Sequence, residues 1–189
     1  EVITAFGRCG GMTGADVFGV TPDIMNVAKQ LTNGAIPMGA VIASKEIYDT
    51  FMEQGGPDYM LEFPHGYTYS AHPVACAAGL AALEILQREK LPQRVAQMAP
   101  YFEDTLHQLK GAAHVSDIRN FGFAGALQLS AYEGEPARRP YEVAQRMWEK
   151  GFYVRYGGDT IQLGLPFVIE KEQIDSLVSA LGDTLAELA

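Results

Sequence analysis

The sequence has few cysteines, few basic residues and no long apolar run. Two cysteines among 189 residues are too few for a disulfide framework, and no Cys/His spacing is typical of a zinc site. Fourteen Lys and Arg against 23 Asp and Glu give a net charge of −9, which argues against nucleic acid and anionic membranes as main partners. No apolar stretch reaches the roughly 18–20 residues that a membrane helix needs, and no signal peptide is recognisable. We expect a cytoplasmic protein.

The residues that are present are enough for a sizeable core. Hydrophobic residues make up 48% of the chain and charged residues 20%, and the length allows one domain or two small ones. The chain begins with Glu1 rather than Met, and Glu1–Gly7 has the pattern of a strand that ends in a glycine-rich loop. From this pattern we expect a sequence that starts in the middle of a domain.

A single lysine, Lys29, stands between two apolar segments. Ile24–Ala28 and Ile36–Ala43 are predicted to be buried strands, joined through a turn at Asn33-Gly34. A lysine buried between them is costly unless it is paired or neutral, and a neutral lysine in an enclosed site is what Schiff-base chemistry requires. The same pattern also fits a lysine that ends the strand and extends its ammonium to water. The residues alone leave both interpretations open.

The segment that follows predicts two helices separated by a long loop. Ser44 is a good N-cap for a short helix over residues 45–52, and residues 53–66 form the loop. Pro73 suits the first turn of a second helix, whose Ala-rich sequence predicts burial on all faces. The hydroxyls of Thr68 and Ser70 precede this helix, so they fit either an anion site or an ordinary Ser/Thr cap.

The second half of the chain predicts an α+β unit with its own core. The expected elements are a helix over 91–109 that Pro100 kinks or splits, a strand pattern with a glycine bend over 115–129, a loop over 131–140, a helix over 140–150, two short strands at 152–156 and 160–163 around a Gly-Gly-Asp turn, and an amphipathic helix over 174–188. We place a domain boundary between residues 79 and 80.

Several segments, taken together and in order, resemble class III pyridoxal-phosphate-dependent aminotransferases. The sequence is most similar to the C-terminal part of the ω-amino acid (β-alanine):pyruvate group. The matching segments are Glu1–Arg8, Pro22–Lys29, Thr32–Val41, His65–Pro73 and Tyr153–Thr160. The resemblance implies an α/β protein of fold type I, with part of the large cofactor-binding domain over residues 1–79 and the small C-terminal α+β domain over residues 80–189.

The resemblance also implies a role for five residues. Lys29 would join the cofactor aldehyde as a Schiff base and, once released, move the proton between substrate and cofactor. Thr68 would bind the phosphate of pyridoxal 5′-phosphate in the neighbouring subunit, because family sites are shared within a homodimer or a dimer of dimers. Arg155 would receive the substrate carboxylate, for which its planar guanidinium is suited. Val2 would pack against the pyridine ring, and Gln162 would lie near the cofactor.

The implied activity is a ping-pong transfer of an amino group from a β-alanine-like ω-amino acid or amine to pyruvate, which yields alanine. Within the family the alternatives are a 4-aminobutyrate- or ornithine-type ω-transaminase and a relative with another outcome, such as an aminomutase. From other classes, a non-catalytic remnant that only binds a partner subunit and a cofactor-free Schiff-base lyase remain open. The lyase would leave Thr68 and Arg155 without roles.

The sequence departs from the family pattern near its start. Ala5 stands where the family usually has glycine, and Cys9-Gly10-Gly11 replaces a Thr-Gly pair. The family's aspartate, which pairs with the pyridinium nitrogen, would come directly before Glu1. Without that aspartate the cofactor ring is a poorer electron sink, so we expect the 189-residue chain by itself to be inactive.

Overall fold

A computed structural model describes residues 1–188 as two compact units. The first unit comprises residues 1–7 and 11–92, and the second comprises residues 8–10 and the chain from residue 93 onward. The change between them falls at Pro92–Gln93, after the helix that begins at Pro73. That these units are the family's large and small domains, with the boundary at 79/80, stays a prediction.

The first residues form turns and a short helix, so the predicted strand end over Glu1–Gly7 is wrong. Helix α1 (Gly14–Phe18) follows them, with Thr13 as its N-cap. The Glu1 carboxylate accepts hydrogen bonds from two main-chain N–H groups at the start of this helix, Gly14 N at 3.0 Å and Ala15 N at 2.6 Å. These N–H groups have no partner within the helix, so the Glu1 carboxylate supplies one and holds the first residues of the chain against the start of α1.

The two predicted strands around Lys29 are present, but they are not buried. Strands β1 (Ile24–Ala28) and β2 (Gly39–Ala43) form an antiparallel pair, in which Val27 lies opposite Ala40. A 3₁₀ turn, η1 (Lys29–Thr32), follows β1 directly. Val27 is the only buried residue of these two strands.

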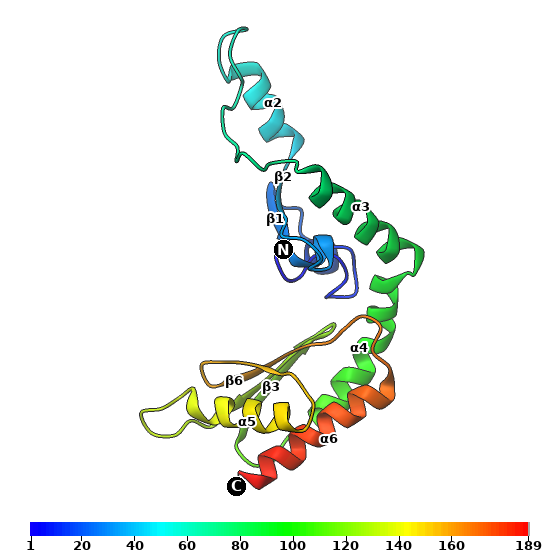
Figure 1. The fold of residues 1–189 in the computed structure, drawn as a ribbon, viewed down its shortest axis with the longest axis vertical. Helices are drawn as coiled ribbons and strands as arrows, with labels where there is room; N and C mark the ends of the chain where they lie inside the picture. The colour runs from blue at the N-terminus through cyan, green and yellow to red at the C-terminus, as the bar shows by residue number, and fades with distance from the viewer. Residues whose placement is uncertain (189) are drawn as a thin grey trace. The chain divides into compact units, whose positions relative to one another are not determined.

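Two longer helices complete the first unit (Figure 1). Helix α2 (Lys45–Gln54) is capped by Ser44 as predicted, and a loop leads to helix α3 (Pro73–Arg88). Burial of α3 on all faces was a wrong expectation. Its buried residues, Ala75, Gly79, Ala82 and Leu86, form one stripe at spacings of three and four, while Leu80 is 70% exposed.

The second unit is built on one antiparallel sheet of four strands in the order β3-β4-β6-β5. Its elements are α4 (Leu91–His107), β3 (Val115–Phe121), β4 (Ala124–Leu129), α5 (Arg138–Glu149), β5 (Arg155–Gly157), β6 (Thr160–Gly164) and α6 (Lys171–Glu187). No helix within residues 1–188 is long and apolar enough to cross a membrane.

Two details of this unit differ from the expectation. Residues 115–129 are a hairpin of two strands rather than one bent strand, because Gly122 turns the chain with a φ of 55°. A Cβ atom on Gly122 would lie 2.3 Å from the carbonyl oxygen of Arg8, so only glycine fits there. Pro100 does not split α4, which runs unbroken to His107 and is anchored by buried residues on both sides of the proline, Val95 and Phe102.

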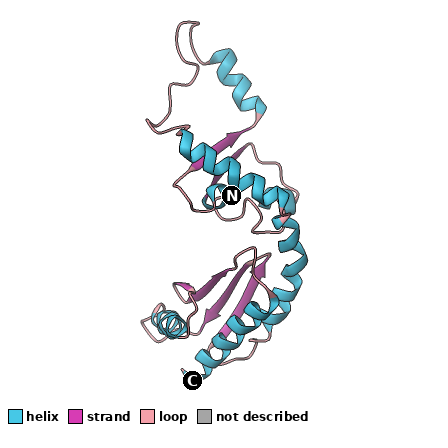
Figure 2. Cartoon of the chain, turned by 45° about the vertical axis from the view of Figure 1, so that its right-hand side comes forward, coloured by secondary structure: helices cyan, strands magenta, loops and turns pink. Residues whose placement is uncertain are grey.

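The predicted core of the second unit is confirmed. Alternate residues of β4 are buried, and a Cβ atom on Gly125 would lie 2.8 Å from the ring of Phe102 on α4. Helices α4 and α6 therefore cover one face of the sheet, as both views show (Figures 1 and 2). The other face carries the side chains that alternate with the core, among them Ala126, Gln128 and Gln162.

Candidate functional site

Lys29 has a backbone conformation that is unusual for a lysine. Its φ is 51°, in the left-handed region, where a side chain costs on the order of 1–3 kcal/mol of strain. The η1 turn maintains this conformation, because the carbonyl of Lys29 accepts a hydrogen bond from Gly34 N at 3.3 Å. The residue is exposed, so its side chain is not enclosed between the two strands. Its ammonium has no hydrogen bond or ion pair with any residue among 1–188, which leaves the amine available for chemistry.

Thr68 lies in the loop before α3. Its two neighbours in the sequence, Tyr67 and Tyr69, line a cavity of about 500 Å³, and Thr68 itself does not. Residues 36–39 line one side of this cavity, and Tyr67 with residues 69–72 of the loop line another. Ser70 uses its hydroxyl to accept a hydrogen bond from Tyr67 N at 3.0 Å, which tightens the loop. The Thr68 hydroxyl is exposed and has no hydrogen-bond partner within residues 1–188. Of the two hydroxyls, Thr68 is thus the one that remains available for a ligand.

Val2 lies in the turn segment and is 41% exposed. Its neighbour Glu1 is anchored to the start of α1, and the Thr4 hydroxyl also donates to the same carboxylate. These hydrogen bonds lower the pKa of Glu1, although desolvation by burial, the largest single influence, acts in the opposite direction. Val2 is therefore held on a fixed turn with its apolar side chain partly open.

Arg155 and Gln162 are brought together, seven residues apart in the sequence. They are directly paired across β5 and β6, so their side chains leave the same face of the sheet. A Cβ atom on Gly157 would lie 3.2 Å from the amide nitrogen of Gln162, which shows how closely this side chain passes over the hairpin. Arg155 is exposed, and its guanidinium has no partner among residues 1–188. It is therefore a cation available to an anionic ligand.

The five predicted residues divide between the two units. Val2, Lys29 and Thr68 belong to the first unit, and Arg155 and Gln162 belong to the second. The only predicted pair in direct register is Arg155 with Gln162.

Sequence patterns did not reveal the role of Arg8. Its guanidinium donates to the carbonyl oxygens of Phe123 at 3.2 Å and Leu165 at 2.5 Å, and it lies 4.7 Å from the centre of the Phe167 ring. Burial lowers the pKa of Arg8. These contacts attach residues 8–10 to the second unit, whereas the residues on either side belong to the first. A lone arginine in a glycine-rich segment gives no periodic signal of such a role.

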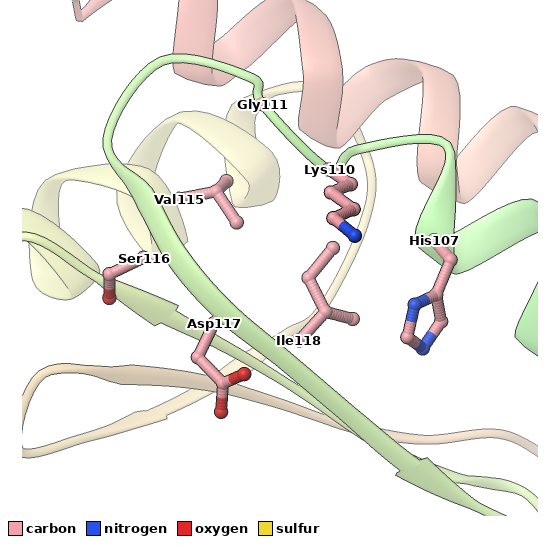
Figure 3. Close-up of a pocket in the computed structure, with 7 residues that line it drawn as sticks. All are labelled: His107, Lys110, Gly111, Val115, Ser116, Asp117 and Ile118. Atoms are coloured by element: carbon pink, nitrogen blue, oxygen red, sulfur yellow. The ribbon is translucent and has the colours of Figure 1, made fainter.

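Another hollow, of about 190 Å³, lies beside the edge strand β3 and contains none of the predicted residues (Figure 3). His107 and Lys110 line one side, and Asp117 and Ile118 line the other. Nε2 of His107 is 2.9 Å from Asn120 Oδ1, and Asp117 accepts a hydrogen bond from Arg119. Within residues 1–188 no group of three His, Cys, Asp or Glu side chains could hold a metal ion.

The fold places the chain among transaminases. An amine transaminase from an uncultivated Pseudomonas species, solved in its PLP-bound form, superposes with a TM-score of 0.91 at 36% identity, over 100% of this chain and 44% of that one. The two units thus form a partial fold-type I structure of mixed helix and sheet, as the resemblance implied.

Residues 1–185 match the family "Aminotransferase class-III", and the chain belongs to this family. It is 61% identical to the beta-alanine–pyruvate aminotransferase of Pseudomonas aeruginosa and 62% identical to the omega-amino acid–pyruvate aminotransferase of Pseudomonas putida. A mitochondrial gamma-aminobutyrate transaminase of rice is 35% identical over 98% of the chain and 37% of its own length. Each Pseudomonas alignment covers 100% of this chain, which spans 42% of the length of either relative.

Proposed function

We propose that this chain is the C-terminal part of a pyridoxal-phosphate-dependent transaminase that moves an amino group from a β-alanine-like ω-amino acid to pyruvate. One observation carries the proposal. Lys29, at the position that matches the family's Schiff-base lysine, presents an amine without a partner among residues 1–188, on a strained left-handed backbone. Such strain is typical of functional sites, where the surrounding structure has to maintain it.

Three side chains of the first unit fit pyridoxal phosphate. The Lys29 amine suits the cofactor aldehyde, the Thr68 hydroxyl suits a phosphate oxygen, and Val2 offers an apolar surface for the ring. Bound pyridoxal phosphate would supply the conjugated ring that takes up the electron pair released when a substrate C–H bond breaks. Thr68 would serve the site of a neighbouring subunit, as the family resemblance implies, so the working unit is a homodimer or a dimer of dimers in the cytoplasm.

Each residue then has a distinct task in the reaction. The Lys29 amine would move a proton from the substrate carbon to the cofactor in the first half-reaction, and in the opposite direction in the second. Arg155 binds the carboxylate of β-alanine, and later that of pyruvate, through two parallel N–H donors. Because its guanidinium has no internal partner, it swings aside at little cost when the amine donor lacks a carboxylate. Gln162, its cross-strand neighbour, contributes a neutral polar group at the same place.

Higher identity to the pyruvate-using relatives favours this substrate pair over the runner-up. The two Pseudomonas enzymes named for pyruvate are 61% and 62% identical to the chain, against 35% for the rice gamma-aminobutyrate transaminase. A 4-aminobutyrate- or ornithine-type enzyme remains the alternative. Initial rates with β-alanine, 4-aminobutyrate and ornithine as donors to pyruvate separate the two, and β-alanine should be the fastest.

The decisive test compares two lysines in the full-length enzyme. Lys29→Ala should abolish the visible absorbance of lysine-bound cofactor and reduce kcat by at least about a thousandfold. Lys90→Ala is the matched control, because Lys90 is also exposed and also left-handed, with a φ of 53°, and it should leave both unchanged. A full-length protein without the chromophore would be a non-catalytic remnant, and the proposal would fail. The 189-residue chain alone should show no turnover.

A further inference from the structure

The strand that carries Arg155 is short and has little support of its own. Strand β5 contains three residues, lies at the edge of the sheet and pairs only with β6. An edge strand of this length is held mainly by the turn that joins it to its neighbour. The position of the Arg155 backbone therefore depends on the turn at Gly158-Asp159.

Asp159 attaches this turn to the middle of the sheet. One carboxylate oxygen accepts a hydrogen bond from Gln128 Nε2 at 2.8 Å, and the other accepts one from the Thr160 hydroxyl at 2.9 Å. The Asp159 carbonyl also accepts a hydrogen bond from Leu129 N at 2.8 Å. The hydrogen bonds from Thr160 and Gln128 lower the pKa of Asp159, so its carboxylate stays ionised at neutral pH. Both Gln128 and Leu129 belong to β4, which lies on the far side of β6 from β5.

Gln128 is itself fixed from the opposite side. Its side-chain oxygen accepts a hydrogen bond from Arg119 Nη1 at 3.0 Å, and the same nitrogen donates to Asp117. A continuous series of hydrogen bonds thus runs from β3 at one edge, through Gln128 on β4, to the turn of the hairpin at the other edge. The members restrict one another's rotamers, so the turn is anchored to a rigid element.

We infer that Asp159 is a positioning residue for substrate carboxylates, which holds the β5–β6 turn so that Arg155 moves its side chain while its backbone stays in place. This inference rests on the proposed function, in which Arg155 binds the carboxylate. A guanidinium on a loosened edge strand loses more conformational entropy when it binds, so carboxylate substrates bind more weakly. An amine donor without a carboxylate does not use Arg155 and is unaffected.

The test separates substrates with and without a carboxylate in the full-length enzyme. Asp159→Ala should raise KM for β-alanine and for pyruvate about three- to tenfold, because it removes two hydrogen bonds, with kcat little changed. In the half-reaction with a carboxylate-free arylalkylamine, kcat/KM should stay within about twofold of the parent. Gln128→Leu should give the same pattern, and the double variant should show less than the sum of the two effects, since both substitutions remove the hydrogen bond between Gln128 and Asp159.

Controls decide which of the two claims fails. Asp183→Ala removes an exposed carboxylate on α6 and should change neither substrate. Suppose that Arg155→Ala raises KM for β-alanine, but Asp159→Ala leaves KM unchanged for both β-alanine and the arylalkylamine, or raises it equally for both. The positioning role is then wrong and the proposed function stands. If Arg155→Ala does not distinguish the donors, the proposed task of Arg155 and the positioning role of Asp159 are both wrong, while the test on Lys29 still decides whether the protein is a transaminase. Asp159→Asn keeps one acceptor oxygen and should show a smaller shift in the same direction, which keeps the test valid should Asp159→Ala unfold.

Discussion

The two units differ in whether they enclose their own apolar residues. Among the largest fully buried side chains of the chain, all except Leu86 lie in the second unit. In the first unit, large apolar side chains remain open on β2 and the loop after α2, such as Val41 at 69%, Tyr59 at 86% and Leu61 at 69% exposure. Exposed apolar surface of this extent marks a region that other protein covers. We therefore expect the unit with Lys29 and Thr68 to depend more on surrounding protein than the unit with Arg155.

The two units should behave differently when they are separated. Residues 93–189 should unfold with a single cooperative thermal transition, because their sheet is covered by α4, α5 and α6. Residues 1–92 should show no cooperative transition, because the buried residues of that unit are too few to offset its conformational entropy. Circular dichroism melting of the two fragments and of the whole chain measures this. A sharp transition in residues 1–92 would show that the exposed apolar side chains do not prevent this unit from folding alone.

Two phenylalanines, one in each unit, should differ in how much they contribute to stability. Phe102 is fully buried on α4, against Phe123 and Gly125, whereas Phe51 on α2 is 39% exposed and stacks on Phe63. Phe102→Ala should reduce the free energy of unfolding by about 3–5 kcal/mol, because it leaves a cavity that the sheet cannot fill. Phe51→Ala should change it by less than about 0.5 kcal/mol. Urea titration of the 189-residue chain reports both, and equal losses would contradict the division into a closed and an open unit.

The same difference explains what the sequence could predict. In the second unit, alternation in β4 and the spacing of Ile174, Leu177 and Leu181 in α6 reflect burial within the chain, so periodicity identified these elements. In the first unit the run Ile24–Ala28 was correctly predicted as a strand, but its burial was not, because its covering surface is absent from the residues described. An apolar pattern predicts that a segment will be buried, but it does not predict which part of the protein will cover it.

The candidate site was predictable by resemblance and only partly by pattern. Lys29 and Thr68 stood out as polar groups beside apolar segments, yet their roles required the family order of the segments. The pairing of Arg155 with Gln162 follows from the short turn between two strands, which a local signal specifies. Arg8 and Asp159 were missed because each acts through partners far away in the sequence, Leu165 and Gln128 respectively.

The smallest expected effect concerns an ion pair within the second unit. Glu187 on α6 accepts a hydrogen bond from Lys150 at 2.8 Å and one from Arg146 on α5 at 3.4 Å, and the first of these is the main reason why the pKa of Glu187 is lowered. A carboxyl with a lower pKa in the folded state stabilises the fold at pH values above its unfolded pKa. That contribution disappears as the pH falls through the folded pKa.

The second unit should therefore melt at a lower temperature as the pH is reduced below about 4.5, the usual pKa of a glutamate. Glu187→Gln should lower the melting temperature slightly at pH 7 and remove this part of the pH dependence. Glu53→Gln, on the exposed helix α2 of the first unit, should change neither, because Glu53 has no ion pair within residues 1–188. Melting curves of the three chains between pH 3 and pH 7 measure the effect. Identical slopes for the parent and Glu187→Gln would mean that the contact between α5 and α6 does not depend on this charge.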